Sequence, residues 1–381
     1  MKMRRKKGTM KYLFSEDIQY VSSRKRKFNH KALVAAILLA ILFVAFSVVS
    51  FVTIHQVFGE MFGRAEKPQQ TIYETYEDLS RDFSRTEITF LSEEDELTGY
   101  IYGASKNPKG MVVISHGIGG GADSYIQEAT YFAKKGYKVL SFSNTGSHES
   151  EGKGTMGLSQ SVIDLDAALD YVEAQKEYED LPVYLYGHSW GGYAVTAILN
   201  YDHEIAAVAS VAGYNSPMEM IMAWGKPQMG ILAYVEYPYL WIYQKLLFGG
   251  ASNLSATEGI NSVDTPVLVI HGTEDEVIPY DGPSIIAHQD EITNANAVFL
   301  TCSGENQNGH DSLFMAESAI TYQEELNAER KMLQEEYGGE DQVPEEVLAE
   351  WYAGVDRRKA SRLDEVFMQD VYKFFRDAEK N

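Results

Sequence analysis

Cysteine is almost absent from this chain, since Cys302 is the only one among 381 residues. The sequence therefore has neither a disulfide framework nor a thiolate cluster that would hold a metal. It also lacks an H-E-x-x-H pair, and the glycine-rich stretch 115–121 lacks both the G-K-[S/T] ending and the G-x-G-x-x-G spacing of phosphate-binding loops. These absences argue against metalloenzymes and nucleotide-binding proteins, so we expect no metal and no cofactor.

Basic residues are scarce outside the N-terminus. Residues 1–31 hold 11 of the 33 lysines and arginines and only two acids, whereas the rest of the chain carries 22 basic and 53 acidic side chains. We interpret residues 1–31 as a basic arm. Because the acidic remainder repels nucleic acid, no nucleic-acid partner is predicted.

One long apolar run follows the basic arm. Residues 32–54 contain 23 positions without a charge, which is enough for a helix that spans a lipid bilayer. A cleaved signal peptide has a shorter apolar core and a small-residue cleavage site, and residues 55–60 offer no such site. Since positive charge stays in the cytoplasm, we predict a single-pass anchor in the cell membrane, with a cytoplasmic N-terminus. Residues 55–85 would form a juxtamembrane stalk, with the rest of the chain outside.

From residue 86 onward, strand and helix patterns alternate. Residues 87–90 and 97–102 resemble a hairpin. Continuous apolar strands are expected at 110–115, 138–142, 182–185, 206–211, 266–270 and 297–300. Helical stretches such as 161–174 lie between most of them. The alternation predicts one α/β domain over residues 86–381, with a mostly parallel, doubly wound sheet covered by helices on both faces.

Two stretches interrupt this alternation. Residues 214–260 are rich in methionine, tyrosine and tryptophan, and they are either a buried helix pair or a cap that covers an apolar pocket favouring apolar acyl groups. Under the second interpretation Met222, Trp224 and Trp241 are pocket candidates. Residues 312–360 are acidic and helix-rich, and we interpret them as a solvated helical insertion.

The stretch 187–191 reads G-x-S-x-G around Ser189, between an apolar strand and a helix-length segment. A serine at such a turn is a nucleophile elbow, in which an acid and then a histidine follow the serine in chain order. His310 lies in a polar loop after the last strand, where catalytic groups are commonly held. His288 falls in an expected helix over residues 283–290 and is the weaker alternative for the base.

The acid is expected after the preceding strand. Asp275 is the preferred residue, with Glu274 and Glu276 as rivals. An oxyanion hole is expected from the backbone N–H groups of Ile118 and Trp190, because glycines around Ile118 let amides turn toward one point.

Five segments, taken in order, resemble the motif set of the α/β-hydrolase superfamily. They are residues 116–120, 144–150, 187–192, 271–279 and 309–310. The chain is most similar to the bacterial serine aminopeptidase-like and lysophospholipase-like branch, over residues 86–311 and the final helix. The resemblance implies an α/β-hydrolase fold with a helical cap insertion, preceded here by one transmembrane helix.

The same resemblance implies roles for individual residues. Ser189 would be the nucleophile, Asp275 the acid and His310 the base, and His116 joins the pocket candidates. The chain departs from the family where residues 143–150 lack its basic residue, and where residues 312–360 are inserted. We therefore predict a membrane-anchored serine hydrolase that cleaves a carboxylic ester or related acyl bond through an acyl-enzyme. The alternatives are a serine peptidase of the same fold and a non-catalytic surface module.

Overall fold

The long N-terminal helix α1 comprises His30–Met61 and contains the whole predicted apolar run. The computed structural model describes residues 29–379, so all but three residues of the predicted basic arm lie outside it. By length and composition, α1 is apolar enough to cross a membrane. The chain divides into two compact units, one ending at Val49 and the other beginning at Ser50.

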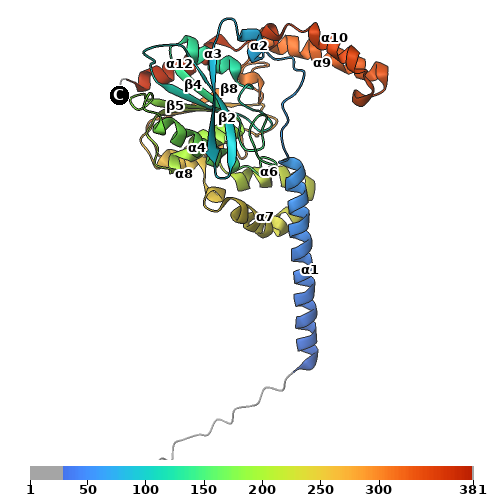
Figure 1. The fold of residues 1–381 in the computed structure, drawn as a ribbon. Helices are drawn as coiled ribbons and strands as arrows, with labels where there is room; N and C mark the ends of the chain where they lie inside the picture. The colour runs from blue at the N-terminus through green and yellow to red at the C-terminus, as the bar shows by residue number, and fades with distance from the viewer. Residues whose placement is uncertain (1–28, 380–381) are drawn as a thin grey trace, which may run out of the picture. The chain divides into compact units, whose positions relative to one another are not determined.

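Within the described residues of the second unit, eight strands form one sheet in the order β1-β2-β4-β3-β5-β6-β7-β8 (Figure 1). The first two strands form an antiparallel hairpin, β2 pairs with β4 antiparallel, and all later pairings are parallel. The predicted hairpin and the mostly parallel sheet are therefore confirmed. The strands are β1 (Arg85–Ser92), β2 (Asp95–Tyr102), β3 (Met111–Ser115), β4 (Lys138–Phe142), β5 (Val183–His188), β6 (Ile205–Val211), β7 (Val267–Gly272) and β8 (Ala297–Cys302).

The central strands are buried on both faces, because successive side chains point to opposite sides of the sheet. In β3, Met111 and Val113 join one apolar cluster, while Val112 and Ile114 join the other. The helices α3 (Ile126–Lys134) and α12 (Glu365–Ala378) contribute to the second cluster. The first cluster is covered by α4 (Gln160–Ala174), α5 (Trp190–Ala197) and α8 (Ala256–Asn261) (Figure 1).

The remaining α-helices lie in the two insertions and in the segment after α1. Residues 214–260 are mostly helical, as predicted, and contain α6, α7 and α8. Residues 312–360 form a largely exposed helical region. These α-helices are α2 (Tyr76–Leu79), α6 (Pro217–Met229), α7 (Leu232–Phe248), α9 (Glu317–Tyr337), α10 (Glu345–Ala353) and α11 (Arg357–Ala360). Short 3₁₀ helices are formed by Ile198–Asn200, Ala251–Asn253, Ile285–Glu291, Ser312–Phe314 and Glu340–Gln342.

The segment after α1, predicted as a stalk, packs against the α/β domain. Arg64 donates hydrogen bonds to the carbonyls of His148, Ser150 and Gly152 at 2.5, 2.9 and 2.9 Å. These carbonyls belong to the loop after β4, where the sequence lacks the basic residue of the family pattern. A guanidinium suits this position because its fork of donors reaches several acceptors at once. The segment is therefore part of the folded domain rather than a free stalk.

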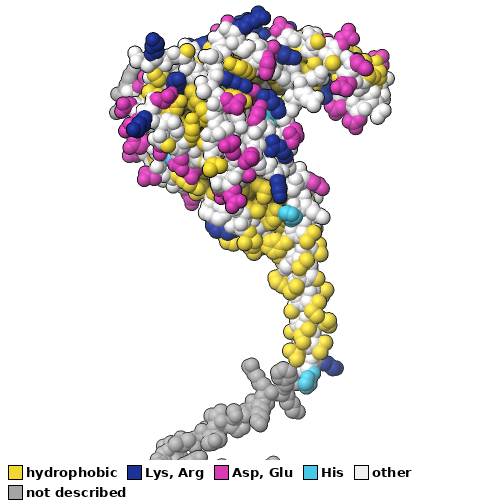
Figure 2. Space-filling view, in the orientation of Figure 1, with side chains coloured by type: hydrophobic (Ala, Val, Ile, Leu, Met, Phe, Trp, Pro, Cys, Tyr) yellow, Lys and Arg dark blue, Asp and Glu magenta, His cyan; other side chains and the backbone are white. Residues whose placement is uncertain are grey.

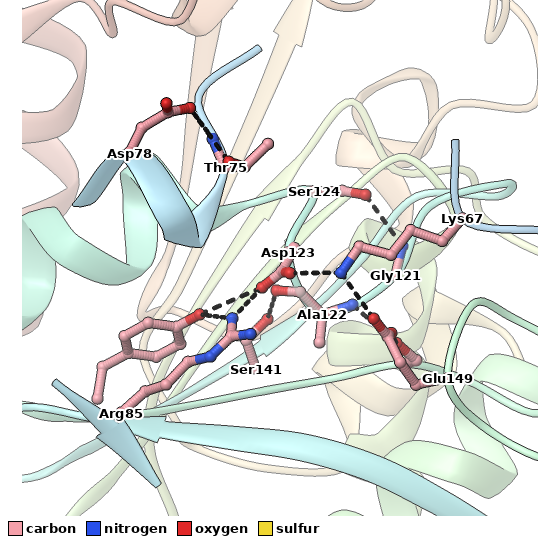
Figure 3. A network of polar contacts seen from close by, with 12 residues as sticks. Lys67, Thr75, Asp78, Arg85, Gly121, Ala122, Asp123, Ser124, Ser141 and Glu149 are labelled. Carbon is pink, nitrogen blue, oxygen red and sulfur yellow. Dashed lines mark hydrogen bonds and ion pairs between the residues drawn. The ribbon is translucent and has the colours of Figure 1, made fainter. Parts of the chain in front are cut away.

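A polar network continues this attachment (Figure 3). The Lys67 ammonium lies 2.8 Å from an Asp123 oxygen and 2.7 Å from a Glu149 oxygen. Burial alone lowers the pKa of Lys67, but its hydrogen bonds to the two carboxylates raise it above the ordinary value. On the other side of Asp123, Arg85 pairs with the same carboxylate and stacks on the Tyr100 ring, 3.5 Å from its centroid. The network joins the segment after α1 to the start of α3.

Candidate active site

Ser189 lies at a sharp turn between β5 and α5. It has φ 58° and ψ −117°, a conformation that costs a non-glycine residue on the order of 1–3 kcal/mol. Its N–H donates to the Val211 carbonyl at 2.8 Å, which holds the turn against β6. Glycine is required on both sides, because a Cβ on Gly187 would lie 2.2 Å from the Gly191 oxygen, and one on Gly191 would lie 1.9 Å from the Ser115 oxygen.

The structure brings Ser189, His310 and Asp275 into one chain of hydrogen bonds. The Ser189 Oγ lies 2.8 Å from His310 Nε2, and His310 Nδ1 lies 2.8 and 3.0 Å from the two Asp275 oxygens. Because an ionised carboxylate only accepts, Nδ1 carries the proton and Nε2 is free to accept the serine proton. All three residues are buried.

Asp275 is held as an anion. Burial on its own raises the pKa of this carboxyl, but hydrogen bonds from His271 and His310 outweigh it and lower the pKa well below its usual range. The N–H groups of Val277 and Ile278 also donate to Asp275 Oδ1, at 2.9 and 2.7 Å. The negative charge beside His310 is therefore present at all ordinary pH values.

The pKa of His310 is raised from its ordinary value. Burial lowers it, and the Asp275 hydrogen bond and charge, with the nearby Asp311 charge, outweigh that effect. Such an environment stabilises the imidazolium that forms when the ring accepts a proton.

The rival residues occupy other positions. The Glu276 side chain accepts the backbone N–H of His310 at 3.3 Å and does not meet the ring nitrogens that bind Asp275. Glu274 is exposed, and its backbone N–H donates to the Asn308 carbonyl at 2.9 Å. His288 pairs with Glu219 and Glu291, so it is not among the groups gathered at Ser189.

The loop after β3 lies beside Ser189. Gly120 donates to the Gly117 carbonyl at 3.1 Å, and Gly119 has φ +78°, so the chain turns tightly around Ile118. Trp190 is the first residue of α5, and the first N–H groups of a helix have no intrahelical acceptor. The two residues expected to form the oxyanion hole, Ile118 and Trp190, therefore lie in segments that adjoin Ser189.

His116 supports this loop instead of lining the pocket. Its Nε2 accepts the Asn144 N–H at 3.0 Å, and its Nδ1 therefore donates to the Gly117 carbonyl at 2.7 Å. The ring is fully buried, and burial lowers its pKa to about 4, so it is neutral. The sequence signal for His116 was its place in the glycine-rich motif, which a structural role satisfies equally well.

Two further residues were not found from the sequence. The Tyr125 hydroxyl accepts the Gly117 N–H at 3.2 Å and lies 2.7 Å from His188 Nδ1. The opposite nitrogen, His188 Nε2, donates to the His310 carbonyl at 3.0 Å. Burial lowers the pKa of His188 to about 3 and keeps the ring neutral. This relay ties the loop at Gly117 to the loop that carries His310.

A cavity of about 590 Å³ opens at Ser189 and His310. Its walls include Tyr73 and Glu74 from the segment after α1, and Phe314, Gln323 and Leu363 from the acidic insertion and its flank. The sequence predicted a stalk for the first region and a solvated helical insertion for the second, and it gave neither a role at the site. They reach it because residues 63–79 are held on the loops after β3 and β4, and residues 312–314 directly follow His310.

The expected cap does not line this cavity. Met222 contributes to another hollow, near Pro238 and His288, and Trp224 to one near Arg64 that shares Ile118 with the cavity at Ser189. Trp241 is 40% exposed on α7. None of the three candidates lines the cavity at Ser189 itself. Trp224 lies nearest to it, in a hollow that also contains Ile118 and Gly119, whereas α7 packs beside the end of α1.

The cavity wall is acidic. Glu74, Asp123, Glu128 and Asp311 line it, whereas its lysine, Lys67, is already paired with Asp123. Glu128 is only 3% exposed, and burial raises the pKa of its carboxyl to about 7. Because Asp123 is paired with Lys67 and Arg85 and Glu128 is only partly ionised near pH 7, Glu74 and Asp311 are the carboxylates that would disfavour an anionic substrate in this cavity.

Two groups of side chains have metal-ligating atoms close together within the part of the chain that the structure describes. One consists of His188, His310 and Asp311, and the other of Asp166, Asp170 and His203. In the first group, His310 Nε2 is already bonded to the Ser189 hydroxyl and His188 Nε2 to the His310 carbonyl. The second group is partly exposed, and its histidine, His203, is already paired with the Asp166 carboxylate. Neither supports a metal-dependent reaction.

The comparisons with known proteins concern the family and the fold. The family model "Serine aminopeptidase, S33" matches residues 106–256. The chain is 24% identical over 173 residues to the lysophosphatidylserine lipase ABHD12 of Danio rerio, covering 45% of this chain and 44% of that relative. It is 33% identical over 89 residues to the monoglyceride lipase of Mus musculus, covering 23% and 29%. The chain thus spans less than half the length of these relatives.

Among solved structures, the chain is similar to an alpha-beta hydrolase from Vibrio vulnificus. The TM-score is 0.51 at 17% identity, and the match covers 71% of this chain and 91% of that one. At this level of identity the likeness concerns the fold.

Proposed function

We propose that this chain, which has an α/β-hydrolase fold and matches a serine aminopeptidase family model over residues 106–256, is a serine hydrolase that cleaves a carboxylic ester through an acyl-enzyme on Ser189. The observation that carries the proposal is the hydrogen-bonded chain from the Ser189 Oγ through His310 to Asp275. The serine also sits in a strained turn, which is a common property of functional sites. Two relatives named as lipases support an ester as the substrate class.

In the proposed reaction the Ser189 Oγ attacks the ester carbonyl carbon while His310 Nε2 takes the hydroxyl proton. The carbonyl oxygen becomes an oxyanion, which the N–H groups of Ile118 and Trp190 would stabilise. The tetrahedral intermediate collapses, the alcohol leaves with the proton from His310, and the acyl group remains on Ser189. Water then attacks this ester with His310 as base, releasing the acid and restoring the serine.

Asp275 acts through His310 in this scheme. Its carboxylate keeps the proton on Nδ1 and stabilises the imidazolium in both halves of the reaction. The Tyr125–His188 relay holds the His310 loop against the loop at Gly117, so we assign both residues a positioning role.

Labelling with a fluorophosphonate probe tests the proposal. The full-length protein should be labelled and should hydrolyse p-nitrophenyl esters, and Ser189→Ala should abolish both. Ser303→Ala, an exposed serine after β8, is the matched control and should keep both. A folded wild-type protein that neither reacts with the probe nor turns over any ester would support the non-catalytic surface module instead.

A peptidase-like activity is the second candidate. The observation that favours it is the acidic cavity wall, since Glu74 and Asp311 would attract an ammonium group such as the free amine of a peptide. A panel of aryl esters and aminoacyl amides with the same acyl group distinguishes the two. Faster turnover of the amides would favour the peptidase.

We also propose that α1 anchors the enzyme in the cell membrane, with the α/β domain on the extracytoplasmic side. The 32-residue apolar helix and the basic residues before it support this topology. Protease added to spheroplasts should digest the domain after residue 61. Protection of the domain, with digestion only after lysis, would reverse the orientation.

A further inference from the structure

A large apolar surface is exposed on α7 and the turn before it. Ile231 is 79% exposed and Leu246 76%, and charged residues within Met229–Phe248 are confined to Glu236 and Lys245. Figure 2 shows hydrophobic side chains gathered over this part of the domain. A patch of this kind on a folded domain marks an interaction site, because isolated apolar side chains are normal but contiguous ones are not.

The helix has three distinct faces. One packs into the domain through Ala233, Gln244 and Phe248, which are buried. The exposed face includes Val235, Ile242 and Leu246, which are spaced seven and four residues apart and therefore lie along one side of the helix.

The third face of α7 contacts the end of α1. Glu236 lies 3.0 Å from the Ser50 hydroxyl, and the rings of Tyr239 and Phe51 are 5.6 Å apart, edge to face. Tyr243 is hydrogen-bonded to His55 at 3.0 Å. Ser50 and Phe51 belong to the uncharged run that ends at residue 54, whereas His55 lies just beyond it. The contacts therefore place α7 at the level where the apolar run ends.

We propose that the exposed face of α7, with the turn at Ile231, lies in the lipid bilayer in which α1 is anchored. This proposal rests on the proposed membrane anchoring and is independent of the hydrolase reaction. Lipid is the occupant that fits, because the surface adjoins the last turns of the apolar run. Tyr234, Tyr237 and Trp241 add the aromatic side chains that are enriched at the membrane interface.

This inference also explains the composition of residues 214–260. Methionine and aromatic residues suit a substrate pocket and a lipid-facing helix equally, but this segment does not line the cavity at Ser189. Its apolar side chains would instead give the domain a second attachment beside the helical anchor.

Fluorescence quenching tests the proposal in the full-length protein. Cys302→Ser removes the one native thiol, and Leu246→Cys or Val235→Cys then carries an NBD label in phosphatidylcholine vesicles. The matched control is Val366→Cys, a 70% exposed apolar position on α12. We expect doxyl-labelled lipid to quench NBD at 246 and 235, and aqueous iodide to quench it at 366. Equal iodide quenching at all three positions would overturn the proposal.

A second copy of the chain is the competing occupant. It would shield position 246 from iodide without doxyl quenching, and the shielding would disappear in nanodiscs that hold one chain each; that result would also overturn the proposal. Persistence of doxyl quenching in such nanodiscs supports it.

The outcome can be separated from the hydrolase proposal. Val235→Asp with Leu246→Asp should lower the doxyl quenching of a label at Ile231→Cys, while turnover of a water-soluble ester stays within about twofold of the parent. An inactive wild-type enzyme would defeat the proposed function and leave the quenching result intact. Extraction of the wild-type protein from vesicles by alkaline carbonate would defeat the anchoring, and this proposal with it.

Discussion

The two regions that differ most from their sequence-based interpretation are the insertion at 214–260 and the segment at 63–79. The insertion is apolar and was a candidate cap, yet it contributes no wall to the cavity at Ser189. The segment after α1 is polar and was a candidate stalk, yet Tyr73 and Glu74 line that cavity and Arg64 holds the adjoining loop. Composition indicates which side chains avoid water, but it does not indicate whether protein, substrate or lipid covers them.

The first prediction concerns the proposed catalytic centre, to which both regions are compared. Asp275→Asn should lower kcat/KM for a p-nitrophenyl ester by about 10⁴-fold, because the neutral amide neither fixes the His310 tautomer nor stabilises its cation. Glu274→Gln and Glu276→Gln are the matched controls and should change it by less than about tenfold. A large loss at Glu276 with activity kept at Asp275 would move the acid.

The second prediction concerns the electrostatic cost of the cavity wall. The Glu128 carboxyl has a pKa of about 7 in the folded protein, against an ordinary value of 4.5, because of burial. Between these two pH values the unfolded chain releases the proton while the folded chain retains it, so the folded state loses stability as pH rises. Glu128→Gln removes this loss and should be more stable than wild type at pH 8, by roughly 3 kcal/mol.

Thermal or denaturant unfolding of the detergent-solubilised protein at pH 4 and pH 8 measures this difference. The advantage of Glu128→Gln should be much smaller at pH 4, where both states are protonated. Glu317→Gln, an exposed glutamate in the first turn of α9, should show no such pH dependence. An advantage that is the same at both pH values would mean that the carboxyl is not desolvated.

The third prediction compares the two regions directly. Tyr73→Ala removes an aromatic ring from the cavity and should change the preference between small and bulky esters by roughly tenfold in kcat/KM, the effect of about 1.4 kcal/mol. Tyr234→Ala, on α7, should change the preference by less than about twofold. The reverse order would restore the cap interpretation of residues 214–260.

The fourth and smallest effect is on pH dependence. His310 has to be neutral to accept the serine proton, so kcat/KM should fall as pH drops through its pKa. Burial lowers this pKa, but Asp275 and Asp311 raise it above 6.5, so the midpoint should lie above pH 6.5. Asp311→Asn should shift the midpoint downward, because it removes one of the negative charges that favour the imidazolium. The exposed Asp281→Asn should leave it in place.

The sheet and the order of the candidate catalytic residues were predictable from local patterns. Apolar strands alternate with helices, and a G-x-S-x-G turn fixes where the serine lies relative to them. The histidine and the segment that holds the acid then follow from chain order, since the carboxyl ends of parallel strands meet at one edge of the sheet. Ser189, His310 and the segment around Asp275 could therefore be nominated before their distances were known. Chain order did not separate Asp275 from Glu274 and Glu276.

The parts that could not be predicted depend on contacts between distant segments. Arg64 reaches His148 across 84 positions, and Tyr125 reaches His188 across 63. No motif encodes such pairs, because a single arginine or tyrosine in a polar segment has no periodic signal. The sequence also did not show what the apolar face of α7 contacts, because a helix face buried in protein and one buried in lipid have the same apolar side chains.

The hydrogen bonds of Arg64 have a consequence for any soluble form of this protein. A cut that separates the α/β domain from α1 would leave the cavity intact only if it falls before Arg64, because Arg64 and Lys67 hold the loops that border Ser189 and Tyr73 completes the wall. Between Met61, where the helix ends, and Arg64 there are only two residues. On the proposed topology and function, proteolytic release from the membrane would therefore abolish activity at nearly every position where a protease finds extended chain between the helix and α2.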